Sequence, residues 1–306
     1  PQNHIDNIGL VRELARRGEL ESLEMMFDSV PDILSQLIRT AFVAREGSRF
    51  IVADFSAIEA RVIAWLAGEE WRMQAFAEGK DIYCASASAM FGVPVVKHGI
   101  NGELRQKGKV AELACGYGGS VGALKAFGAD KMGLTEDEML SIVNNWRASS
   151  PRIVQLWWDV DRAVKTAIAE GTTQRTHGLL FRVQKGILFI KLPSGRSLAY
   201  VKPRLIDGEI TYEGVSSNKG WARLKTWGPK VVENCIQGIS RDLLMNAMKQ
   251  VGPEARICMH IHDELVIEAG DELTLDEVCK RMAEIPEWAE GLLLRADGYE
   301  TKFYLK

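Results

Sequence analysis

Two aspartates far apart in the sequence each lie at the end of a predicted strand. Asp54 follows the short apolar run 50–53, and Asp263 lies at the tip of a predicted hairpin. If the two strands are neighbours, the carboxylates converge, and at about 4 Å they repel by roughly 4 kcal/mol at an effective dielectric constant of 20. Divalent cations relieve such repulsion, and Mg²⁺ favours one or two carboxylates with phosphate and water oxygens. An aspartate after a strand is also a common turn or capping residue, so position alone leaves both interpretations open.

The histidine next to the second aspartate adds only modest support. His262 precedes Asp263 and Glu264, and a turn histidine that faces solvent explains it equally well. His260 and His262 lie two apart on one strand face, but no further ligand follows at the usual spacing for zinc. A zinc site is therefore a poor interpretation.

A basic stripe is predicted on one helix in the middle of the chain. Arg105, Lys109 and Leu113 follow one another at intervals of four residues and so share a helix face. The guanidinium fork and the mobile ammonium group suit a polyphosphate, although a solvated basic face is the alternative. The segment lacks the GxxxxGK[ST] pattern, which excludes a P-loop. Tyr117, which follows among glycines, could stack on a base or belong to the core.

Around these residues the sequence predicts three zones. Residues 1–66 begin with helical patterns and then give the strand 50–53, and Ser56 with Glu59 matches a capping box that opens a helix to Leu66. Residues 67–170 contain helical patterns and almost no strand signal. They include a second capping box at Thr135.

The last zone, from about residue 172 onward, contains short runs in which apolar and polar residues alternate. Such runs predict antiparallel strands. A helix over about 229–251 interrupts them, and the clearest hairpin pairs 256–261 with 264–268. A capped helix begins near Thr274, and the end of the chain looks extended. The picture is an α+β sheet domain split by an all-helical insertion.

Composition restricts the classes of protein to consider. The 306 residues are 46% hydrophobic and 26% charged, which is ordinary for a globular chain. No uncharged apolar run approaches the roughly 20 residues of a membrane helix, and the polar start has no secretory signal. Five cysteines without a CxxC pair indicate free thiols in a reducing compartment. The net charge of −3 means that any nucleic-acid binding must come from local patches.

Together these segments resemble the motifs of family A DNA polymerases. Residues 54–61 resemble motif A, 105–118 have the RxxxKxxxxxxxYG form of motif B, and 262–264 resemble motif C. Gln237-Gly238 resembles the element that precedes motif C. The insert 193–228 and the tail look most similar to the phage or prophage branch of the family.

The resemblance implies a right-hand polymerase fold that lacks its thumb. Residues 1–66 and 171–306 would form the antiparallel-sheet palm, and 67–170 the helical fingers. The chain would be the C-terminal part of a longer polymerase or one half of a split one. Its partners would be primer-template DNA, dNTPs and an upstream thumb segment, with no membrane partner, in the cytoplasm of a bacterial host cell.

The resemblance also assigns the reacting groups. Asp54, Asp263, Glu264 and the Phe55 carbonyl would hold two Mg²⁺ ions, with Mn²⁺ as a substitute. Asp54, Asp263 and Lys109 would be catalytic, and Lys109 would protonate the departing pyrophosphate.

The remaining site residues would bind the two substrates. The nucleotide would contact Arg105, Lys109, Leu113, Tyr117, Glu59 and Tyr83. Glu59 would be the steric gate under the sugar, and Tyr117 would stack near the template base. The DNA would contact Gln237, His262 and Arg61.

Several positions depart from the family pattern. Leu113 stands where many relatives have an aromatic residue, Glu112 where Asn is usual, and Tyr83 where His is common. None of these changes removes an expected metal ligand, so they affect sugar discrimination and affinity rather than the reaction.

The predicted function is template-directed DNA synthesis by two-metal transfer of deoxynucleotidyl units to a primer 3′ hydroxyl. One alternative is a catalytically silent DNA-binding fragment that needs its thumb. A metal-dependent phosphodiesterase or nuclease would also use Asp54 and Asp263, but it gives Arg105 and Lys109 no purpose.

Overall fold

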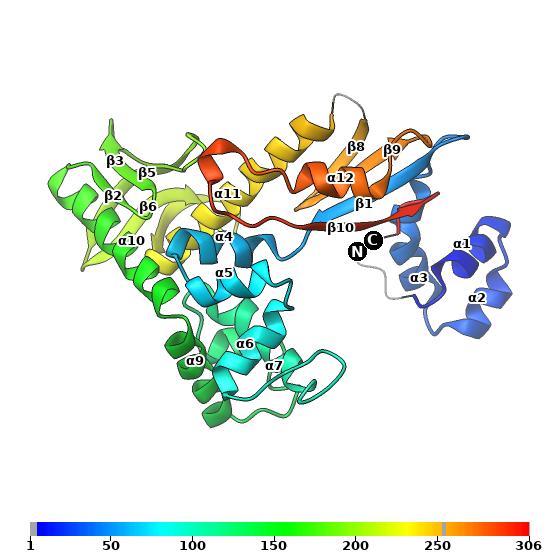
Figure 1. Cartoon of the computed structure of the whole chain (residues 1–306), viewed down its shortest axis with the longest axis horizontal. Coiled ribbons are helices and arrows are strands. Elements are labelled where there is room, and N and C mark those ends of the chain that lie inside the picture. Colours follow the sequence, from blue (N-terminus) through cyan, green and yellow to red (C-terminus); the bar gives the residue numbers. More distant parts are fainter. Residues whose placement is uncertain (1–4, 253–254, 306) are drawn as a thin grey trace. The chain divides into compact units, whose positions relative to one another are not determined.

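The computed structural model describes residues 5–252 and 255–305. Its contacts divide the chain into two compact units, which Figure 1 shows in sequence colours. The first unit comprises residues 1–56, 244–284 and 295–306, and the second comprises 57–243 and 285–294. This division follows other boundaries than the expected limits at 66 and 170, and the assignment of palm and fingers to those ranges stays a prediction.

A four-stranded antiparallel sheet forms the centre of the first unit. Its strand order is β10-β1-β9-β8, with β1 (Arg49–Phe55) between β10 (Ala296–Thr301) and β9 (Glu264–Ala269), and β8 (Arg256–Ile261) at the edge. The strand β1 is almost entirely apolar, and Ile51 and Ala53 are fully buried. A strand that is buried on both faces has a continuous apolar sequence. The apolar run 50–53 therefore predicted β1 correctly.

Four helices belong to the same unit. The first three pack against one another around Val11, Leu23 and Ile33, while the fourth packs on β1 and β10. Gly298 makes this second packing possible, because a Cβ there would lie 2.9 Å from the Leu275 Cδ1 atom of α12 and 2.2 Å from the Val52 carbonyl oxygen of β1. The helices are α1 (Ile8–Arg17), α2 (Leu20–Met26), α3 (Val30–Leu37) with the 3₁₀ turn η1 (Ile38–Ala41), and α12 (Leu275–Met282).

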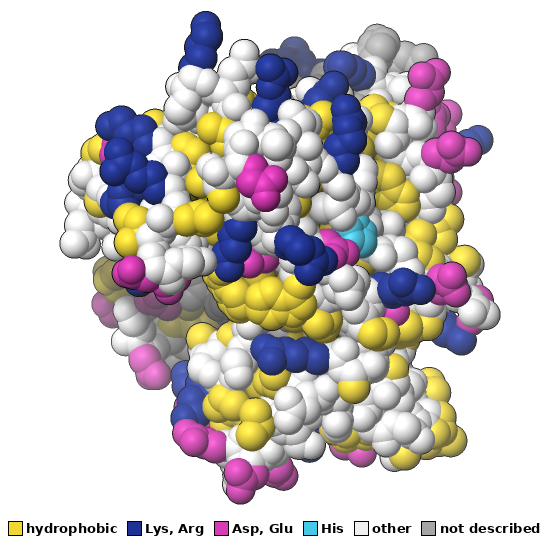
Figure 2. Space-filling model, turned by 90° about the vertical axis from the view of Figure 1, so that its left-hand side faces the viewer, with side chains coloured by type: hydrophobic (Ala, Val, Ile, Leu, Met, Phe, Trp, Pro, Cys, Tyr) yellow, Lys and Arg dark blue, Asp and Glu magenta, His cyan; other side chains and the backbone are white. Residues whose placement is uncertain are grey.

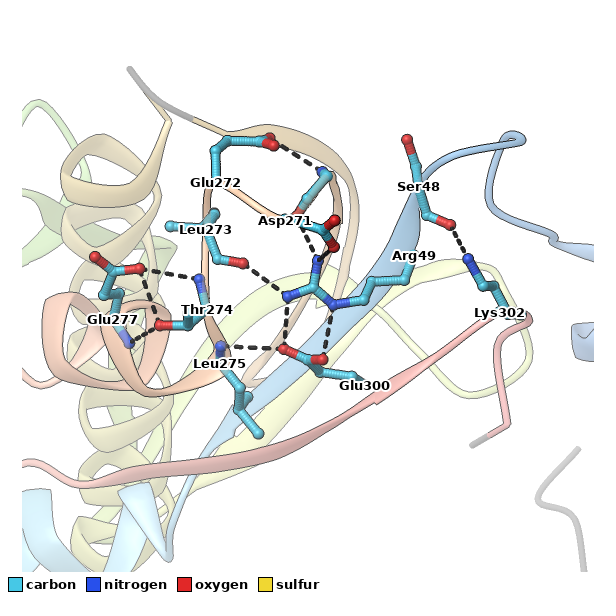
Figure 3. A network of polar contacts seen from close by, with 11 residues as sticks. Ser48, Arg49, Asp271, Glu272, Leu273, Thr274, Leu275, Glu277, Glu300 and Lys302 are labelled. Atoms are coloured by element: carbon cyan, nitrogen blue, oxygen red, sulfur yellow. Dashed lines mark hydrogen bonds and ion pairs between the residues drawn. The ribbon is translucent and has the colours of Figure 1, made fainter.

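An arginine on β1 ties three segments of this unit together (Figure 3). Arg49 donates through Nε and Nη2 to the two carboxylate oxygens of Glu300 on β10, at 2.7 and 2.9 Å. It also donates to the carbonyls of Gly270 and Leu273 in the loop before α12. Thr274 and Glu277 then form the predicted capping box that starts α12. These contacts, which we call the Arg49 clamp, therefore join β1, β10 and the β9–α12 loop.

The second unit begins with seven helices and has no strand before residue 174. This confirms the expected helical stretch. Thr135 and Glu138 form the predicted capping box, and the helix that starts at Pro151 ends before Gly171 as expected. The helices are α4 (Ile58–Ala67), α5 (Glu70–Ala77), α6 (Ile82–Phe91), α7 (Leu104–Cys115), α8 (Val121–Ala126), α9 (Glu136–Ser149) and α10 (Pro151–Glu170).

A six-stranded antiparallel meander completes the second unit, with strands in the order of the sequence from β2 to β7. Alternating runs predicted β4, β5 and β6, but β2, β3 and the edge strand β7 were not predicted. The strands are β2 (Gln174–Thr176), β3 (Leu179–Gln184), β4 (Ile187–Lys191), β5 (Ser197–Ile206), β6 (Glu209–Val215) and β7 (Trp221–Thr226); the helix α11 (Gly228–Val251) and the turn η2 (Glu287–Ala289) follow. None of the described helices combines the length and apolar composition of a membrane crossing.

One expected local structure is wrong. Ser56 does not cap the helix α4: the N-cap is Ala57, in a left-handed conformation with φ of 52° and without a side-chain cap bond. The Ser56 backbone N–H instead donates to the Arg295 carbonyl at 2.8 Å. Glu59 is also engaged elsewhere, because it accepts a hydrogen bond from Tyr117. Both members of the predicted box therefore serve longer-range contacts.

Candidate active site

The structure brings the two predicted catalytic aspartates to the same end of neighbouring strands in the first unit. Asp54 is opposite Glu264 in the β1–β9 register, and the Phe55 N–H donates to the Asp263 carbonyl oxygen at 3.2 Å. Asp263 is thus one residue from the position that faces Asp54. The register therefore places the two aspartates at adjacent positions of neighbouring strands, and their role as metal ligands stays a prediction.

The hairpin turn fixes the second aspartate. His262 and Asp263 form a two-residue connection between β8 and β9, and His262 has a φ of 53°. Two-residue hairpins favour such positive φ values because they match the twist of the strands. His262 is exposed, while Asp263 is partly buried. The imidazole is therefore accessible at the tip, as a contact with a primer end requires.

Glu264 has different surroundings from its neighbour. Glu264 is only 2% exposed, and the Tyr304 hydroxyl donates to Glu264 Oε1 at 2.7 Å. Burial, and then the hydrogen bond to Glu264, raise the pKa of Tyr304. Because this carboxylate is held inside the unit, it serves the packing of the C-terminal segment as well as any role toward a metal.

A divalent cation needs hard oxygen ligands. Among the residues that the structure describes, no group of three or more His, Cys, Asp or Glu side chains is arranged to hold a metal ion. Mg²⁺ does not need such a cage, because it keeps several waters and binds through one or two carboxylates plus substrate phosphates. Asp54 and Asp263 with a backbone carbonyl fit that mode of binding.

A third acid in this row was missed from the sequence. Asp297 on β10 is opposite Asp54 on the side away from Glu264. Directly opposed residues of antiparallel strands point to the same face, so Asp297, Asp54 and Glu264 share one face of the sheet. Arg295 partly neutralises Asp297, with Nη2 to Oδ1 at 3.1 Å. The extended pattern of the C-terminal segment was visible in the sequence, but its partner strand was not.

The predicted nucleotide-binding residues lie in the second unit. On α7, Arg105 donates through Nε and Nη2 to the same Asp81 oxygen, at 2.9 and 2.7 Å, and its guanidinium lies 5.2 Å from the Tyr83 ring centroid. Burial opposes ionisation of Asp81, but the Arg105 hydrogen bonds and the N–H groups of Cys84 and Tyr83 lower its pKa overall. Sequence reasoning missed this partner of Arg105.

Further along α7 the side chains have different surroundings. Lys109 is partly buried, whereas Leu113 is 45% exposed. Gly118 just after the helix has a φ of +78°, and a Cβ there would lie 2.7 Å from both Pro229 and Trp227. Only glycine fits this close approach, which explains part of the glycine cluster.

Glu59 and Tyr117 meet, as their predicted roles near the sugar and the base require. The Tyr117 hydroxyl donates to Glu59 Oε2 at 2.6 Å. Burial, and then the negative charge of Glu59, raise the pKa of Tyr117 well above its ordinary value. The tyrosine therefore stays protonated and fixes the position of the glutamate.

Glu112, one of the departures from the family pattern, has a structural partner. Arg72 is fully buried and donates to both Glu112 oxygens, at 2.7 and 2.8 Å. The Trp146 indole N–H donates to the same carboxylate at 2.8 Å, and Ser150 accepts from Arg72. This buried network joins α5, α7 and α9.

The predicted DNA-contacting residues fall into two kinds. Gln237 is exposed on α11, and Gly238 beside it accepts from Arg196 through its carbonyl at 2.7 Å. Arg61 is only 6% exposed; it donates to the Leu293 carbonyl at 2.9 Å and lies over the Phe76 ring at 4.4 Å. Arg61 is thus occupied inside the unit, and its DNA contact stays a prediction.

Comparisons with known proteins add to this geometry. A family profile described as DNA polymerase family A matches residues 12–295. The chain is also 47% identical to the DNA polymerase of Bacillus phage SP02, over all of its own length and 49% of that relative. The chain belongs to DNA polymerase family A. The predicted resemblance, including its phage branch, is therefore confirmed.

More distant family A members agree. The chain is 27% identical to DNA polymerase I of Pseudomonas aeruginosa and 28% to the thermostable DNA polymerase I of Thermus aquaticus, and it covers 27% and 29% of those relatives. It spans about half the length, or less, of these curated relatives. The POL domain of Pol1 from M. smegmatis, solved in complex with DNA primer-template and dNTP, matches 87% of the chain with a TM-score of 0.56 at 22% identity. This likeness supports the α+β fold class.

Proposed function

We propose that this family A chain carries the catalytic part of a DNA polymerase, which transfers deoxynucleotidyl units from dNTPs to a primer 3′ hydroxyl on a template. The observation that carries the proposal is the placement of Asp54 and Asp263 at one end of adjacent strands. The family membership gives that acid pair its chemistry. The expected partners are primer-template DNA and an upstream thumb segment, in the cytoplasm of a bacterial host.

Asp54, Asp263 and the Phe55 carbonyl would hold the divalent cations, with Glu264 close by. Mg²⁺, or Mn²⁺ in its place, would supply Lewis-acid activation of the 3′ hydroxyl and neutralise charge on the triphosphate. The protein contributes by placing these oxygens on a rigid sheet, since rigid elements hold a reacting geometry better than loops.

Arg105 and Lys109 would bind the triphosphate from one face of α7. A guanidinium fork matches phosphate oxygens, and a lysine supplies a mobile charge and a proton for the departing pyrophosphate. Arg105 forms an ion pair with Asp81 in this structure, so phosphate oxygens would compete with that carboxylate. Tyr83, which lies against the Arg105 guanidinium, would contact the same phosphates.

Glu59, Leu113 and Tyr117 would select the sugar and seat the template base. Because Tyr117 fixes Glu59 through a 2.6 Å hydrogen bond, the carboxylate would form a rigid floor where a ribose 2′ hydroxyl clashes. Gln237, His262 and Arg61 would contact the primer-template.

Primer extension tests the proposal directly. The chain is assayed with a labelled primer-template, dNTPs and Mg²⁺, alone and as part of the longer polymerase that carries its upstream segment. We expect extension in the longer protein, and a loss of extension on chelation by EDTA that Mg²⁺ or Mn²⁺ restores. Absence of template-dependent extension by the longer protein would refute the proposal.

A further inference from the structure

The six-stranded sheet concentrates positive charge. Residues 174–226 contain ten Lys and Arg against three Asp and Glu, a formal charge of +7 in a chain whose net charge is −3. The inner face of this sheet is apolar and buried, as Phe181, Leu188 and Ile190 show. The cations of β2, β3 and β4, which are Arg175, Arg182 and Lys191, alternate with these apolar residues and so point to the opposite face, which we call the outer face.

The strand register places cations around apolar side chains at the β2–β4 end of the outer face. Arg175 on β2 is opposite Leu180 on β3, which is opposite Lys191 on β4. Directly opposed residues lie within about 4.5–5.5 Å at Cβ and point the same way. Both cations are exposed, and Leu180 between them is partly exposed.

The next row of the same face contains an aromatic ring. Arg182 on β3 is opposite Phe189 on β4, and Phe189 is opposite Ala199 on β5. The small, exposed Ala199 leaves one side of the ring open, and Arg182 is exposed on the other side. A partly exposed phenylalanine thus lies next to Arg182 and Lys191 on this face, with Arg175 at the far end of the neighbouring row.

These cations differ from those at the other end of the sheet. On β5–β7, Glu213 binds Lys202 at 2.8 Å and Arg223 at 3.1 Å, and Lys225 is paired with Glu209. In the part of the chain that the structure describes, no such carboxylate pairs with Arg175, Arg182 or Lys191. Their charge is left for a partner that carries negative charge.

We propose that the outer face of β2–β4 binds single-stranded DNA, with phosphates on Arg175, Arg182 and Lys191 and a base stacked on Phe189. Unpaired cations beside an aromatic ring match the two features of a single strand, a phosphate chain and exposed base faces, whereas a duplex hides its base faces. Figure 2 shows one face of the molecule, on which Lys and Arg side chains lie among hydrophobic and acidic ones. This surface is additional to the polymerase residues, and its test does not depend on nucleotide transfer.

Fluorescence anisotropy with labelled oligo(dT), without metal or nucleotide, tests the charge contribution. Two double variants are compared. The test variant combines Arg182→Gln with Lys191→Gln. The control variant combines Lys131→Gln with Lys219→Gln, which removes the same charge from exposed positions outside this face. We expect the first variant to bind roughly tenfold more weakly at low salt. Its slope of log Kd against log salt should fall by about 1.4, since each phosphate contact to a single strand contributes about 0.7. Equal affinities and slopes for the two variants would overturn the proposal.

The aromatic contribution has a separate readout. Phe189→Ala should weaken oligo(dT) binding roughly 5- to 150-fold with the salt slope unchanged. An oligonucleotide carrying 5-iodouracil, crosslinked by light and mapped by mass spectrometry, should label the β3–β4 peptide at Phe189. Label found only on other peptides would refute the site, even where another DNA surface masks a change in affinity. Equal dependence of duplex and single-strand binding on Phe189 would refute the stacking.

Discussion

At the scale of single residues, the predicted nucleotide-binding side chains of the second unit are held with different rigidity. Glu59 is fixed by a short hydrogen bond from Tyr117, whereas Leu113 is 45% exposed and has room for a larger side chain. Arg105 is bound by a carboxylate that a triphosphate would replace. These surroundings determine what substitutions at each position should do.

Removing the Glu59 carboxylate should relax discrimination against ribonucleotides. In the polymerase with its thumb, we expect Glu59→Ala to raise the ratio of rNTP to dNTP incorporation roughly 10- to 200-fold. Tyr117→Phe should raise it less, because the carboxylate remains but loses its anchor. Glu78→Ala, an exposed glutamate of the same unit, is the control. An unaltered ratio in Glu59→Ala would refute the role of the gate.

An aromatic ring at position 113 should change the use of nucleotides that lack a 3′ hydroxyl. Leu113→Tyr would place a ring and a hydroxyl where the sugar is expected, so we predict roughly tenfold better dideoxynucleotide incorporation. Leu140→Tyr, at a leucine of α9 that is 48% exposed, controls for the added bulk. Steady-state incorporation of ddNTP relative to dNTP measures the effect. The same ratio in both variants would show that the sugar pocket lies elsewhere.

At the scale of elements, polar networks connect helices and strands that the sequence does not pair. The Arg72–Glu112 pair joins α5 to α7, and the Arg49 clamp joins β1 to β10 and to the loop before α12 (Figure 3). Removing one partner of the buried Arg72–Glu112 pair leaves an uncompensated charge, and this costs more stability than the pair itself contributes.

The pair in the second unit should show this asymmetry. Glu112→Gln should lower the free energy of unfolding by about 3–5 kcal/mol, because Arg72 keeps its charge without a carboxylate. The double variant Arg72→Met with Glu112→Leu should be more stable than Glu112→Gln alone. Urea unfolding followed by tryptophan fluorescence measures both, since Trp146 belongs to the network. Glu136→Gln, at an exposed pair, is the control, and an equal loss there would contradict the account.

The Arg49 clamp should make stability depend on pH. The hydrogen bond from Arg49 lowers the pKa of Glu300, so its contribution is present above the ordinary glutamate pKa near 4.5 and is lost as pH falls through the lowered value. Arg49→Met should therefore destabilise the protein at pH 7 by about 2–3 kcal/mol, and by less at pH 3. Urea unfolding at both pH values checks this. Arg295→Met is the control, and a loss independent of pH would contradict the role of Glu300.

Sequence reasoning was most successful where the deciding contacts are local. The His262-Asp263 turn fixes its own hairpin, and the boxes at Thr135 and Thr274 each close within four residues. The capping box predicted at Ser56 does not form. The Ser56 N–H donates to the Arg295 carbonyl and Glu59 accepts from Tyr117, and both of these partners are far along the chain. For the same reason Asp81, Tyr304 and Asp297 were not recognised as partners of site residues.

At the scale of the whole molecule, the sequence predicted an α+β chain with a helical segment between sheet-forming segments, and the structure confirms this. The division into two units was not predicted, because residues 285–294 group with the second unit by contacts distant in sequence. The large meander sheet was recognised only in part, since its short edge strands carry weak patterns. Its excess of positive charge is not visible in the net charge of −3.

The central claim is that Asp54 and Asp263 together hold the reacting cations, and single-nucleotide incorporation in the polymerase with its thumb tests it most directly. We predict that Asp54→Asn and Asp263→Asn each lower the rate at least about a thousandfold, or about 4 kcal/mol, with melting temperatures unchanged. Asp271→Asn, at a fully exposed carboxylate of the same unit, should keep the normal rate. A normal rate in either Asp54→Asn or Asp263→Asn would contradict the claim.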